Sequence, residues 1–422
     1  MTPLRFCLLT TFYPPFNFGG DGIDVQRTAR ALVRRGHHVT VVHDVDAYQW
    51  LAGRRLPVEP VDQDGVEVIG LRSRLGVVSP FLTHQLGRPI VHGRAIARLL
   101  RARDPDVVVF NNVSLVGGPG LLALGGEALK VYVAHEHWLV CPTHVLWRFN
   151  REPCDKRACG RCVISYRRPP QVWRYTGALE RHLPQVDLFI ARSEFSREKH
   201  RAFGFQRPMQ VLPYFLPGDI PVRREPSGAP RPQERPYFLF VGRLTRIKGL
   251  DSVIAACGRY AGADLLVIGD GEERALLEAQ AQAFPNVRFL GRIPNEELGR
   301  YYEHALAAIV PSLGYETFGI VLIEAFRYGT PVIARRIGPF PEIVQQSGGG
   351  LVFSTDDDLL AAMARVQDDG GYRADLADRG YQACRRLWSE DAVIGRYLDL
   401  ISEAFAERLA RRALGQPAQA LG

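Results

Sequence analysis

Residues 312–331 read SLGYETFGIVLIEAFRYGTP, and this stretch decides how the second half of the chain folds. An apolar run at 306–310 precedes it, and the apolar residues after Phe318 recur at helical spacing as far as Tyr328. A strand, a loop and a helix in that order place the loop at the carboxyl end of the strand, where open α/β sheets bind ligands. The sequence therefore predicts a ligand site on this loop.

Two glutamates mark that site, Glu316 in the loop and Glu324 about two turns into the helix. The first amides of the helix and the positive end of its dipole favour a phosphate. These amides belong to Thr317, Phe318, Gly319, Ile320 and Val321. A phosphate beside two carboxylates suits a ligand made of phosphate, sugar and ribose. The alternative is an ordinary amphipathic helix with two solvated glutamates.

Length and composition indicate a globular protein of two domains, since 422 residues exceed one typical core. The net charge of +8 fits an anionic ligand or a membrane surface and selects neither, and we expect no nucleic-acid partner. No apolar run reaches the ~18 residues of a membrane span, and Pro14 and Pro15 interrupt the short apolar N-terminus. We expect a cytoplasmic protein whose membrane contact, if any, is peripheral at the inner face.

Short apolar runs alternate with helical stretches in both halves of the chain, which predicts two doubly wound parallel sheets of the α/β class. Residues 217–236 are rich in Pro and Arg, lack periodicity, and are predicted to be a linker. The first half has strands at 4–11, 38–42, 66–69, 106–110, 130–134, 187–190 and 209–212 and helices at 22–35, 90–103, 170–183 and 193–203. The second half has strands at 237–242, 264–269, 287–291, 306–310 and 331–334 and helices at 249–260, 272–283, 295–304, 318–328 and 390–411.

Glycines follow the first strand of each half. Gly19 and Gly20 would let the backbone approach a phosphate or sugar, although the loop lacks the G-x-G-x-x-G spacing of a dinucleotide site. In the second half, VGRLTRIKG (241–249) carries Arg243 and Lys248, which can neutralise a diphosphate, and no Walker motif is present. The alternatives are a plain turn and a basic surface loop.

A histidine, His135, ends the predicted strand 130–134 and could orient a sugar hydroxyl or the reacting phosphate. A structural histidine is the commoner case, and His137 competes for any such role. Helix 92–103 places arginines on one face and apolar residues on the other, so it either touches anionic head groups or packs on the sheet.

Four cysteines crowd into residues 141–162, namely Cys141, Cys154, Cys159 and Cys162. Cys159 and Cys162 have the spacing of a chelating pair, and four thiolates suit a structural zinc. The first two cysteines are too widely spaced for a standard zinc ribbon. An iron–sulfur centre and uncoordinated thiols are the other readings.

Together these motifs resemble the family 4 retaining glycosyltransferases with the GT-B fold. The resemblance covers the glycine pair after the first strand, the step Gly36–Val41, the cleft His135, VGRLTRIKG, the IGDGEER turn at 268–274 with Gly269, and the two glutamates with their Phe-Gly pair. The cysteine-bearing insertion is similar to one in a subset of this family. The GT-B fold implies domains at 1–216 and 237–387, with a helix at 388–412 that returns to the first domain.

The resemblance also implies roles for single residues. Arg243 and Lys248 would neutralise the leaving diphosphate, and Glu316 would bind hydroxyls of the donor sugar. Glu324 would bind the ribose, and His135 would contact the sugar near its anomeric centre. The helix-terminal amides would hold phosphate or sugar, and Gly20 would let the first domain close on the diphosphate.

The function that we expect is transfer of a hexose-type sugar from a nucleotide-diphosphate sugar to a lipid-linked, polysaccharide or other cell-envelope acceptor, with no cofactor or metal required for catalysis. Two alternatives stay open: a sugar-nucleotide epimerase, and a non-catalytic scaffold that binds carbohydrate or metal. No motif in the sequence identifies the donor base, the acceptor or the route to retention.

Overall fold

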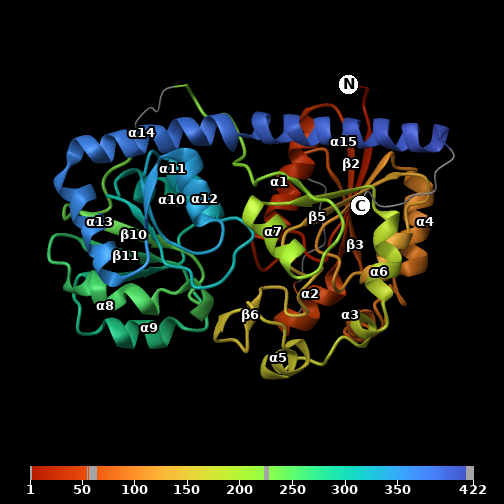
Figure 1. Cartoon of the computed structure of the whole chain (residues 1–422), viewed down its shortest axis with the longest axis horizontal. Helices are drawn as coiled ribbons and strands as arrows, with labels where there is room; N and C mark the ends of the chain where they lie inside the picture. Colours follow the sequence, from red (N-terminus) through yellow and green to blue (C-terminus); the bar gives the residue numbers. More distant parts are fainter. Residues whose placement is uncertain (1, 55, 57–63, 223–227, 415–422) are drawn as a thin grey trace. The chain divides into compact units, whose positions relative to one another are not determined.

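The computed structural model describes residues 2–54, 56, 64–222 and 228–414 (Figure 1). The chain forms two compact units. The N-terminal unit comprises Met1–Val145, Arg157–Leu212 and Ile394–Gly422, and the C-terminal unit comprises Leu146–Lys156 and Pro213–Val393. These bounds differ from the predicted domains: residues 146–156 belong to the C-terminal unit, and the return to the N-terminal unit comes at Ile394.

The predicted linker, 217–236, does not begin as a free segment. The amide of Leu216 donates to the carbonyl of Trp388 at 3.0 Å, and the hydroxyl of Tyr381 donates to the carbonyl of Pro221 at 2.9 Å. Ile220 is buried in the core of the C-terminal unit. The start of the predicted linker is therefore held against the C-terminal unit; residues 223–227 lie outside the described part.

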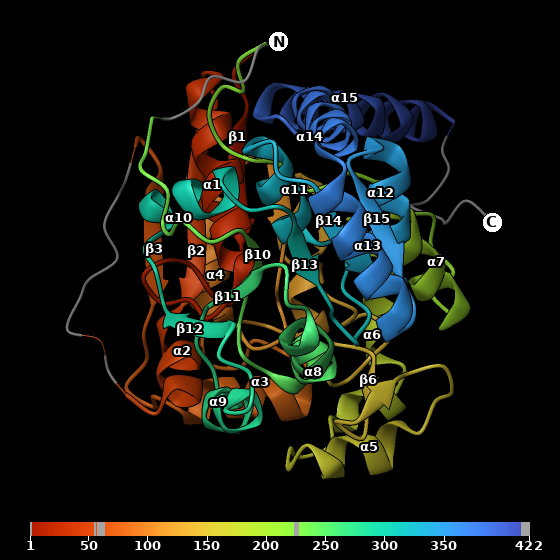
Figure 2. The same ribbon diagram turned by 90° about the vertical axis from the view of Figure 1, so that its left-hand side faces the viewer.

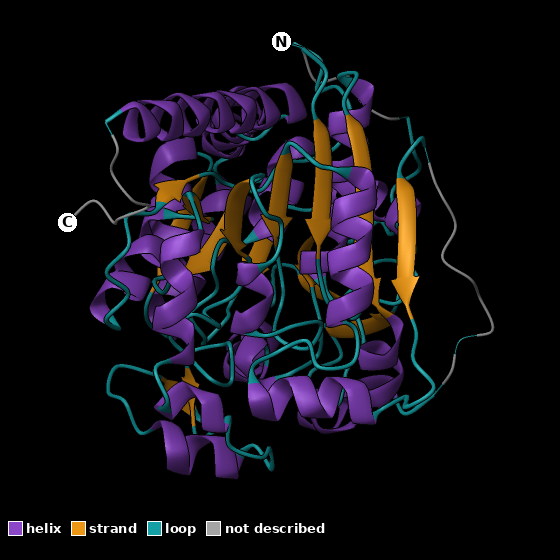
Figure 3. Cartoon of the chain, turned by 90° about the vertical axis from the view of Figure 1, so that its right-hand side faces the viewer, coloured by secondary structure: helices purple, strands orange, loops and turns teal. Residues whose placement is uncertain are grey.

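The N-terminal unit holds a parallel sheet with strand order β3-β2-β1-β4-β5-β8-β9 (Figure 3). Phe6 of β1 is in register with Val39 of β2 on one side and Val107 of β4 on the other, so the strand order reverses at β1. The strands are β1 (Arg5–Leu9), β2 (His38–Asp44), β3 (Glu67–Leu71), β4 (Val107–Phe110), β5 (Leu129–Ala134), β8 (Leu188–Ala191) and β9 (Gln210–Val211). All of them were predicted; fully buried strands such as β4 and β5 are continuous apolar runs.

Helices cover this sheet, and they depart from the prediction in two places. The single helix expected at 170–183 is divided by Gly177, whose φ is +66°, into the 3-10 turn Val172–Tyr175 and helix α6. Helices α2, α3 and α5 were not predicted. The helices are α1 (Gly20–Arg34), α2 (Val45–Ala52), α3 (Val78–Leu86), α4 (Gly93–Arg103), α5 (Cys159–Ser165), α6 (Ala178–His182) and α7 (Glu194–Ala202).

The arginine-rich helix α4 packs its apolar face against the core of the N-terminal unit, which is the second of the two predictions made for it. Ile96 and Leu100 are buried in the core, whereas Arg94, Arg98 and Arg101 are exposed. The apolar face of α4 therefore serves the fold, and its basic face points to solvent.

The C-terminal unit is built on a second parallel sheet of order β12-β11-β10-β13-β14-β15 (Figure 2). Alternate residues of β10 enter different cores, Phe238 and Phe240 one and Tyr237 and Leu239 the other, so both faces of the sheet are covered. The strands are β10 (Tyr237–Val241), β11 (Asp264–Ile268), β12 (Val287–Gly291), β13 (Ala308–Val310), β14 (Val332–Arg335) and β15 (Gly350–Phe353).

Helices and one hairpin complete the chain. The helices are α8 (Asp251–Arg259), α9 (Arg274–Ala281), α10 (Asn295–Glu303), α11 (Ile320–Arg327), α12 (Phe340–Ser347), α13 (Asp356–Asp368), α14 (Gly370–Leu387) and α15 (Glu390–Ala413). The hairpin pairs β6 (Trp147–Arg148) with β7 (Glu152–Pro153). Across the described ranges no helix has both the length and the hydropathy to cross a bilayer. Two doubly wound α/β sheets are thus present, as predicted.

Candidate active site

Two loops meet at the carboxyl ends of β10 and β13, the neighbouring strands at which the order of the C-terminal sheet reverses. The amide of Leu313 donates to the carbonyl of Ile247 at 2.8 Å and joins the loops. Gly249, with φ +67°, allows their close approach, because a Cβ there would lie 2.3 Å from the carbonyl oxygen of Pro311. The topology therefore brings together the two sequence motifs that were predicted to share a site.

The predicted residues Lys248 and Glu316 are in direct contact across these loops. Lys248 Nζ donates to Glu316 Oε1 at 2.7 Å, and Ser312 Oγ donates to the same oxygen at 2.7 Å. The side chains of Lys248 and Glu316 are 26% and 23% exposed. A partly exposed ion pair of this kind is weakly held, so an incoming ligand can replace either partner.

Arg243 lies on the same loop after β10 and is exposed. The glycine of the neighbouring turn, Gly269, has a clear packing role, because a Cβ there would lie 1.8 Å from the carbonyl oxygen of Gly242. Gly269 also has φ +145°. The close approach of the segments after β10 and β11 is therefore sufficient reason for a glycine at position 269, independent of any role in ligand binding.

Helix α11 begins at the end of the second loop, two residues later than predicted. The ring of Phe318 is buried against Tyr214 and Trp388 and anchors the loop in the core. Gly319 precedes the helix with φ +152°. The first-turn amides of any α-helix lack intrahelical partners, so those of Ile320 and the residues around it are suited to an anion.

Glu324 lies on α11 and is half-buried. Burial raises the pKa of Tyr302, and the charge of Glu324 raises it further. The carboxylate of Glu324 is therefore close to the buried side chain of Tyr302 on α10. Its predicted role toward a ribose stays a prediction.

The hairpin β6–β7 supports the loop that carries Glu316. The hydroxyl of Tyr315 donates to Asp155 Oδ1 at 2.7 Å, and the ring of Trp147 lies near Gly314, 3.7 Å from where a Cβ would stand. Residues 146–156 come from the insertion after β5, yet they pack on the C-terminal unit. The periodicity of the sequence does not predict that residues 146–156 belong to a different unit from the residues on either side of them.

In the N-terminal unit, His135 follows β5 and is buried in a polar cluster. Its Nε2 lies 2.9 Å from Asn111 Oδ1. Its Nδ1 lies 3.5 Å from an Nη of Arg192 and 3.8 Å from Asp24 Oδ2, and Arg192 is ion-paired with Asp24. Since Arg192 can only donate, Nδ1 is the acceptor and Nε2 carries the proton.

Burial lowers the pKa of His135 well below its usual value, and the positive charge of Arg192 lowers it further. His135 is therefore a neutral hydrogen-bonding group at physiological pH. The competing His137 is buried as well and stacks on His200 with ring centroids 5.2 Å apart. Burial lowers the pKa of His137 well below its usual value too.

The glycines at the start of α1 differ in their surroundings. Gly19 has an extended backbone at the N-cap, and a Cβ on Gly20 would meet no heavy atom within 4 Å. A Cβ on Gly22 would lie 2.5 Å from Asn17 Oδ1 and 3.0 Å from the carbonyl oxygen of Phe12. Packing therefore requires a glycine at position 22. It does not require one at position 20, where a side chain would have space.

The four cysteines do not form a compact ligand set in the described part of the chain. The sulfur atoms of Cys141, Cys159 and Cys162 do not all lie within 4.8 Å of one another, and Cys154 belongs to the other unit. Tetrahedral zinc with Zn–S bonds of ~2.3 Å needs sulfur atoms about 3.8 Å apart. Zinc bound by these thiols would require their sulfur atoms to come closer together. The structural zinc stays a prediction that metal analysis of the purified protein would test.

A different group of metal-type ligands lies at the N-terminus of α2, where Asp44, Asp46 and His92 are buried together. His92 Nε2 is 3.2 Å from Asp46 Oδ2, and Asp44 Oδ1 accepts from the amide of Ala47 at 3.0 Å as the N-cap. Burial raises the pKa of Asp44 to about 7, against the attraction of His92. Helix capping by Asp44 and the contacts of His92 with both aspartates account for the cluster.

Sequence reasoning missed several polar partners in these clusters. Ser312, Asn111, Asp24 and Arg192 lie far in sequence from the groups they contact or have no motif of their own. Asn111 follows the buried strand β4 directly, and a polar residue at the carboxyl end of such a strand is the one signal that was available.

Comparisons with known proteins identify the family of this chain. Residues 18–216 match the model described as Glycosyltransferase Family 4, and residues 222–383 match that of Glycosyl transferases group 1. The chain is 31% identical to the D-inositol 3-phosphate glycosyltransferase of Acidothermus cellulolyticus, over 97% of this chain and 94% of the relative. It is 27% identical to a glycogen synthase of Mycobacterium tuberculosis, over 92% of this chain and 91% of the relative.

Solved structures share the fold. Sucrose-phosphate synthase from Thermosynechococcus elongatus superposes with a TM-score of 0.74 at 21% identity, covering 96% of this chain and 100% of that one. Anabaena Alr3699/HepE in complex with UDP-glucose superposes with a TM-score of 0.64 at 16% identity, covering 95% and 100%. Fold and sequence thus define a GT-B glycosyltransferase, and the chain belongs to the family 4 and group 1 glycosyltransferases.

Proposed function

We propose that this protein transfers a hexose-type sugar, with retention at the anomeric carbon, from a nucleotide-diphosphate sugar to a cell-envelope or polysaccharide acceptor. The observation that carries the proposal is the contact between Lys248 and Glu316 at the strand-order reversal of the C-terminal sheet. A cation and a carboxylate in contact at this position would serve a diphosphate and the hydroxyls of a sugar, respectively. A structural neighbour was solved with UDP-glucose, which supports a donor of this class.

The leaving group sets the chemistry that the site must supply. When the bond from the anomeric carbon to the diphosphate oxygen breaks, its electron pair goes to that oxygen, and the sugar becomes oxocarbenium-like. Lys248, Arg243 and the first amides of α11 would stabilise the negative charge. These groups can do so without a divalent cation, so we propose that none is needed.

The remaining residues would position the sugar. Glu316 would accept hydrogen bonds from the donor hydroxyls once Lys248 turns to the diphosphate, and Glu324 would bind the ribose. His135 would act as a neutral hydrogen-bonding group, because its pKa lies far below physiological pH. The acceptor oxygen would attack the face from which the diphosphate leaves and pass its proton to the donor phosphate; a double displacement through a carboxylate is the other route to retention.

We propose a lipid-linked or polysaccharide acceptor bound by the N-terminal unit. The exposed arginines of α4 offer a basic face for a membrane-proximal acceptor or for peripheral contact with anionic lipid. Curated relatives include a Rhizobium meliloti lipopolysaccharide core glycosyltransferase and a Mycolicibacterium smegmatis phosphatidyl-myo-inositol mannosyltransferase, which support this class.

The experiment that tests the donor site is slow hydrolysis of UDP-, GDP-, ADP- and TDP-sugars without an acceptor. One donor should be hydrolysed by the wild type and not by Glu316→Ala, and EDTA should not stop the reaction. Glu324→Ala should weaken nucleotide binding more than turnover. Absence of nucleotide binding to the wild type would contradict the proposal and favour a non-catalytic scaffold.

A further inference from the structure

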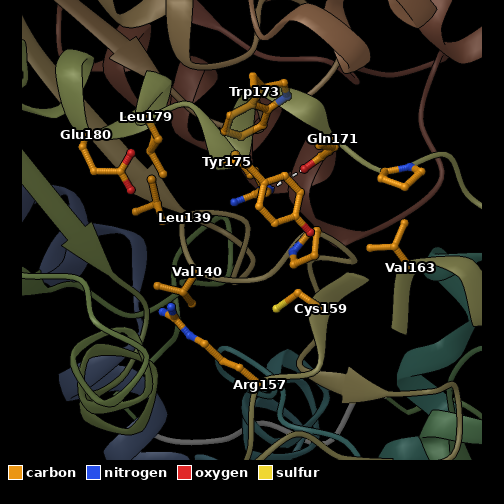
Figure 4. A pocket seen from close by; sticks show the side chains of 13 residues that line it. Leu139, Val140, Arg157, Cys159, Val163, Gln171, Trp173, Tyr175, Leu179 and Glu180 are labelled. Atoms are coloured by element: carbon orange, nitrogen blue, oxygen red, sulfur yellow. Dashed lines mark hydrogen bonds between the residues drawn. The ribbon is translucent and has the colours of Figure 1, made fainter. Parts of the chain in front are cut away.

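A cavity of about 250 Å³ opens in the N-terminal unit, in the insertion that follows His135 (Figure 4). It is below the ~300 Å³ at which pockets for drug-sized ligands begin, so it suits a single ring with a small substituent. Its wall is formed by the segment after His135, by α5, by the residues that lead into α6 and by α6 itself. Those used below are Arg157, Gln171, Arg174, Tyr175 and Glu180.

The guanidinium of Arg174 is the unusual group in this wall. Its Nε donates to Gln171 Oε1, and one Nη donates to the carbonyl oxygen of Trp138 at 2.7 Å. It also lies over the ring of Trp173, 4.5 Å from the centroid. Arg174 is thus held rigidly by neutral partners.

No carboxylate lies within salt-bridge distance of Arg174 in the described residues; Glu136 acts on it only from farther away. Burial lowers the pKa of Arg174 to about 10. A largely buried cation without an anionic partner is costly, and an anion that enters the cavity would remove that cost.

Arg157 adds a second cation at the wall and is exposed. The acid among the described lining residues, Glu180, is exposed as well and pairs with neither arginine.

Aromatic surface completes the cavity. Tyr175 is 70% exposed, and its hydroxyl lies beside Gly160 of α5, 3.7 Å from where a Cβ would stand. Exposed aromatic faces beside hydrogen-bonding groups suit the apolar face of a sugar ring. Two guanidiniums suit a carboxylate or phosphate through paired hydrogen bonds.

We propose that this cavity binds an anionic sugar, a single ring that bears a carboxylate or phosphate, as part of the acceptor. Arg174 and Arg157 bind the anionic group, and Tyr175 contacts the ring. The assignment to the acceptor rests on the proposed function, since the donor residues Lys248 and Glu316 belong to the other unit. Binding to the cavity itself does not depend on catalysis.

The test is direct binding of small probes to the whole protein, measured by NMR titration without any donor. Glucuronate and glucose 6-phosphate represent the two sources of negative charge, glucose is the neutral control, and inorganic phosphate is the control without a ring. We expect at least one charged sugar to bind ten-fold or more tightly than glucose and than phosphate. Equal binding of glucose, equal binding of phosphate, or no binding of either charged sugar would overturn the proposal.

Two variants with opposite expected effects on the affinity for the charged sugar test whether it binds in this cavity. Arg174→Gln should weaken binding of the charged sugar about 10–100-fold, as for loss of hydrogen bonds to a charged group. Glu180→Gln, an exposed change with little risk to folding, should tighten binding about two- to five-fold because it removes a nearby negative charge. Unchanged affinity in both variants would overturn the assignment.

Donor hydrolysis separates this proposal from the proposed function. Slow donor hydrolysis by the wild type tests the donor residues Lys248 and Glu316, which belong to the other unit, and does not depend on what the cavity binds. If charged sugars bind but no donor is hydrolysed, the cavity assignment stands and the donor assignment fails. If Arg174→Gln instead releases a bound metal and no probe binds the wild type, Arg174 is the counter-charge of a thiolate centre and the sugar proposal is wrong.

Discussion

The two polar clusters at strand ends differ in their access to solvent. In the C-terminal unit, Lys248 and Glu316 are about one-quarter exposed and hold each other in an ion pair. In the N-terminal unit, His135, Asp24 and Arg192 are buried. An exposed pair costs little to break and is therefore suited to binding and release of a charged ligand. A buried network is costly to disturb and is suited to holding one neutral side chain in a set orientation.

The largest expected effect comes from breaking the buried network. Asp24→Ala should lower the free energy of unfolding by about 3–5 kcal/mol, because it leaves Arg192 charged and buried without its carboxylate. Arg192→Leu should cost less, since Asp24 can take up a proton whereas arginine stays charged. Urea unfolding measures both. The exposed pair Arg396–Glu403 is the control, and Glu403→Ala should cost under ~1 kcal/mol.

Breaking the exposed pair should affect activity rather than stability. Glu316→Ala and Lys248→Ala should each lower the transfer rate about 10²–10³-fold, as for loss of one preorganised contact to the transition state. Thermal unfolding should place their stability within about 1 kcal/mol of the wild type. Glu278→Ala, which removes an exposed partner of Arg274, should retain full activity. A large loss of stability in Glu316→Ala would contradict the contrast between the clusters.

A third cluster makes the N-terminal unit sensitive to pH. Burial raises the pKa of Asp44 to about 7. Burial opposes the charge of His92, but the hydrogen bond to Asp46 and the charges of both aspartates outweigh it and raise its pKa. Groups with raised pKa values stabilise the fold fully at low pH and lose that contribution as pH rises. For Asp44 the loss runs from about pH 4 to about pH 7.

Asp44→Asn should remove part of that slope, because asparagine still caps α2 but does not ionise. Between pH 5 and pH 8 the wild type should lose about 1–3 kcal/mol more stability than the variant. Urea unfolding at four pH values measures the difference. Parallel profiles for the two proteins would show that Asp44 does not titrate in this range.

The smallest effect concerns the two glycines at the start of α1. Gly22→Ala should destabilise the protein by about 1–3 kcal/mol, because its Cβ would overlap Asn17 and Phe12. Gly20→Ala should change stability by less than ~0.5 kcal/mol, since space is open there. If that space is kept for a diphosphate, Gly20→Ala should raise the KM for the donor about ten-fold. An unchanged KM would remove Gly20 from the donor site.

The sequence predicts the parallel sheets well and the polar networks poorly. Strands such as β4 and β10 are continuous apolar runs, and Gly242 and Arg243 directly after β10 mark one of the site loops. By contrast, the pair Arg192–Asp24 joins residues 168 positions apart, and nothing local predicts it. The hairpin Trp147–Pro153 was missed for the same reason, since it belongs to one unit with the distant segment Pro213–Val393.

The return of the chain at Ile394 has a consequence for synthesis. The N-terminal unit includes the end of α15, where Arg408 donates to the carbonyl oxygen of Ala128 at 2.8 Å and lies 3.7 Å from Asp187. A ribosome must first make residues 213–393, that is 393 − 212 = 181 residues, before this segment exists. At ~5–20 residues per second this takes roughly 10–40 s. During that interval the N-terminal sheet has been synthesised but lacks α15. The N-terminal unit is therefore translated first and completed last.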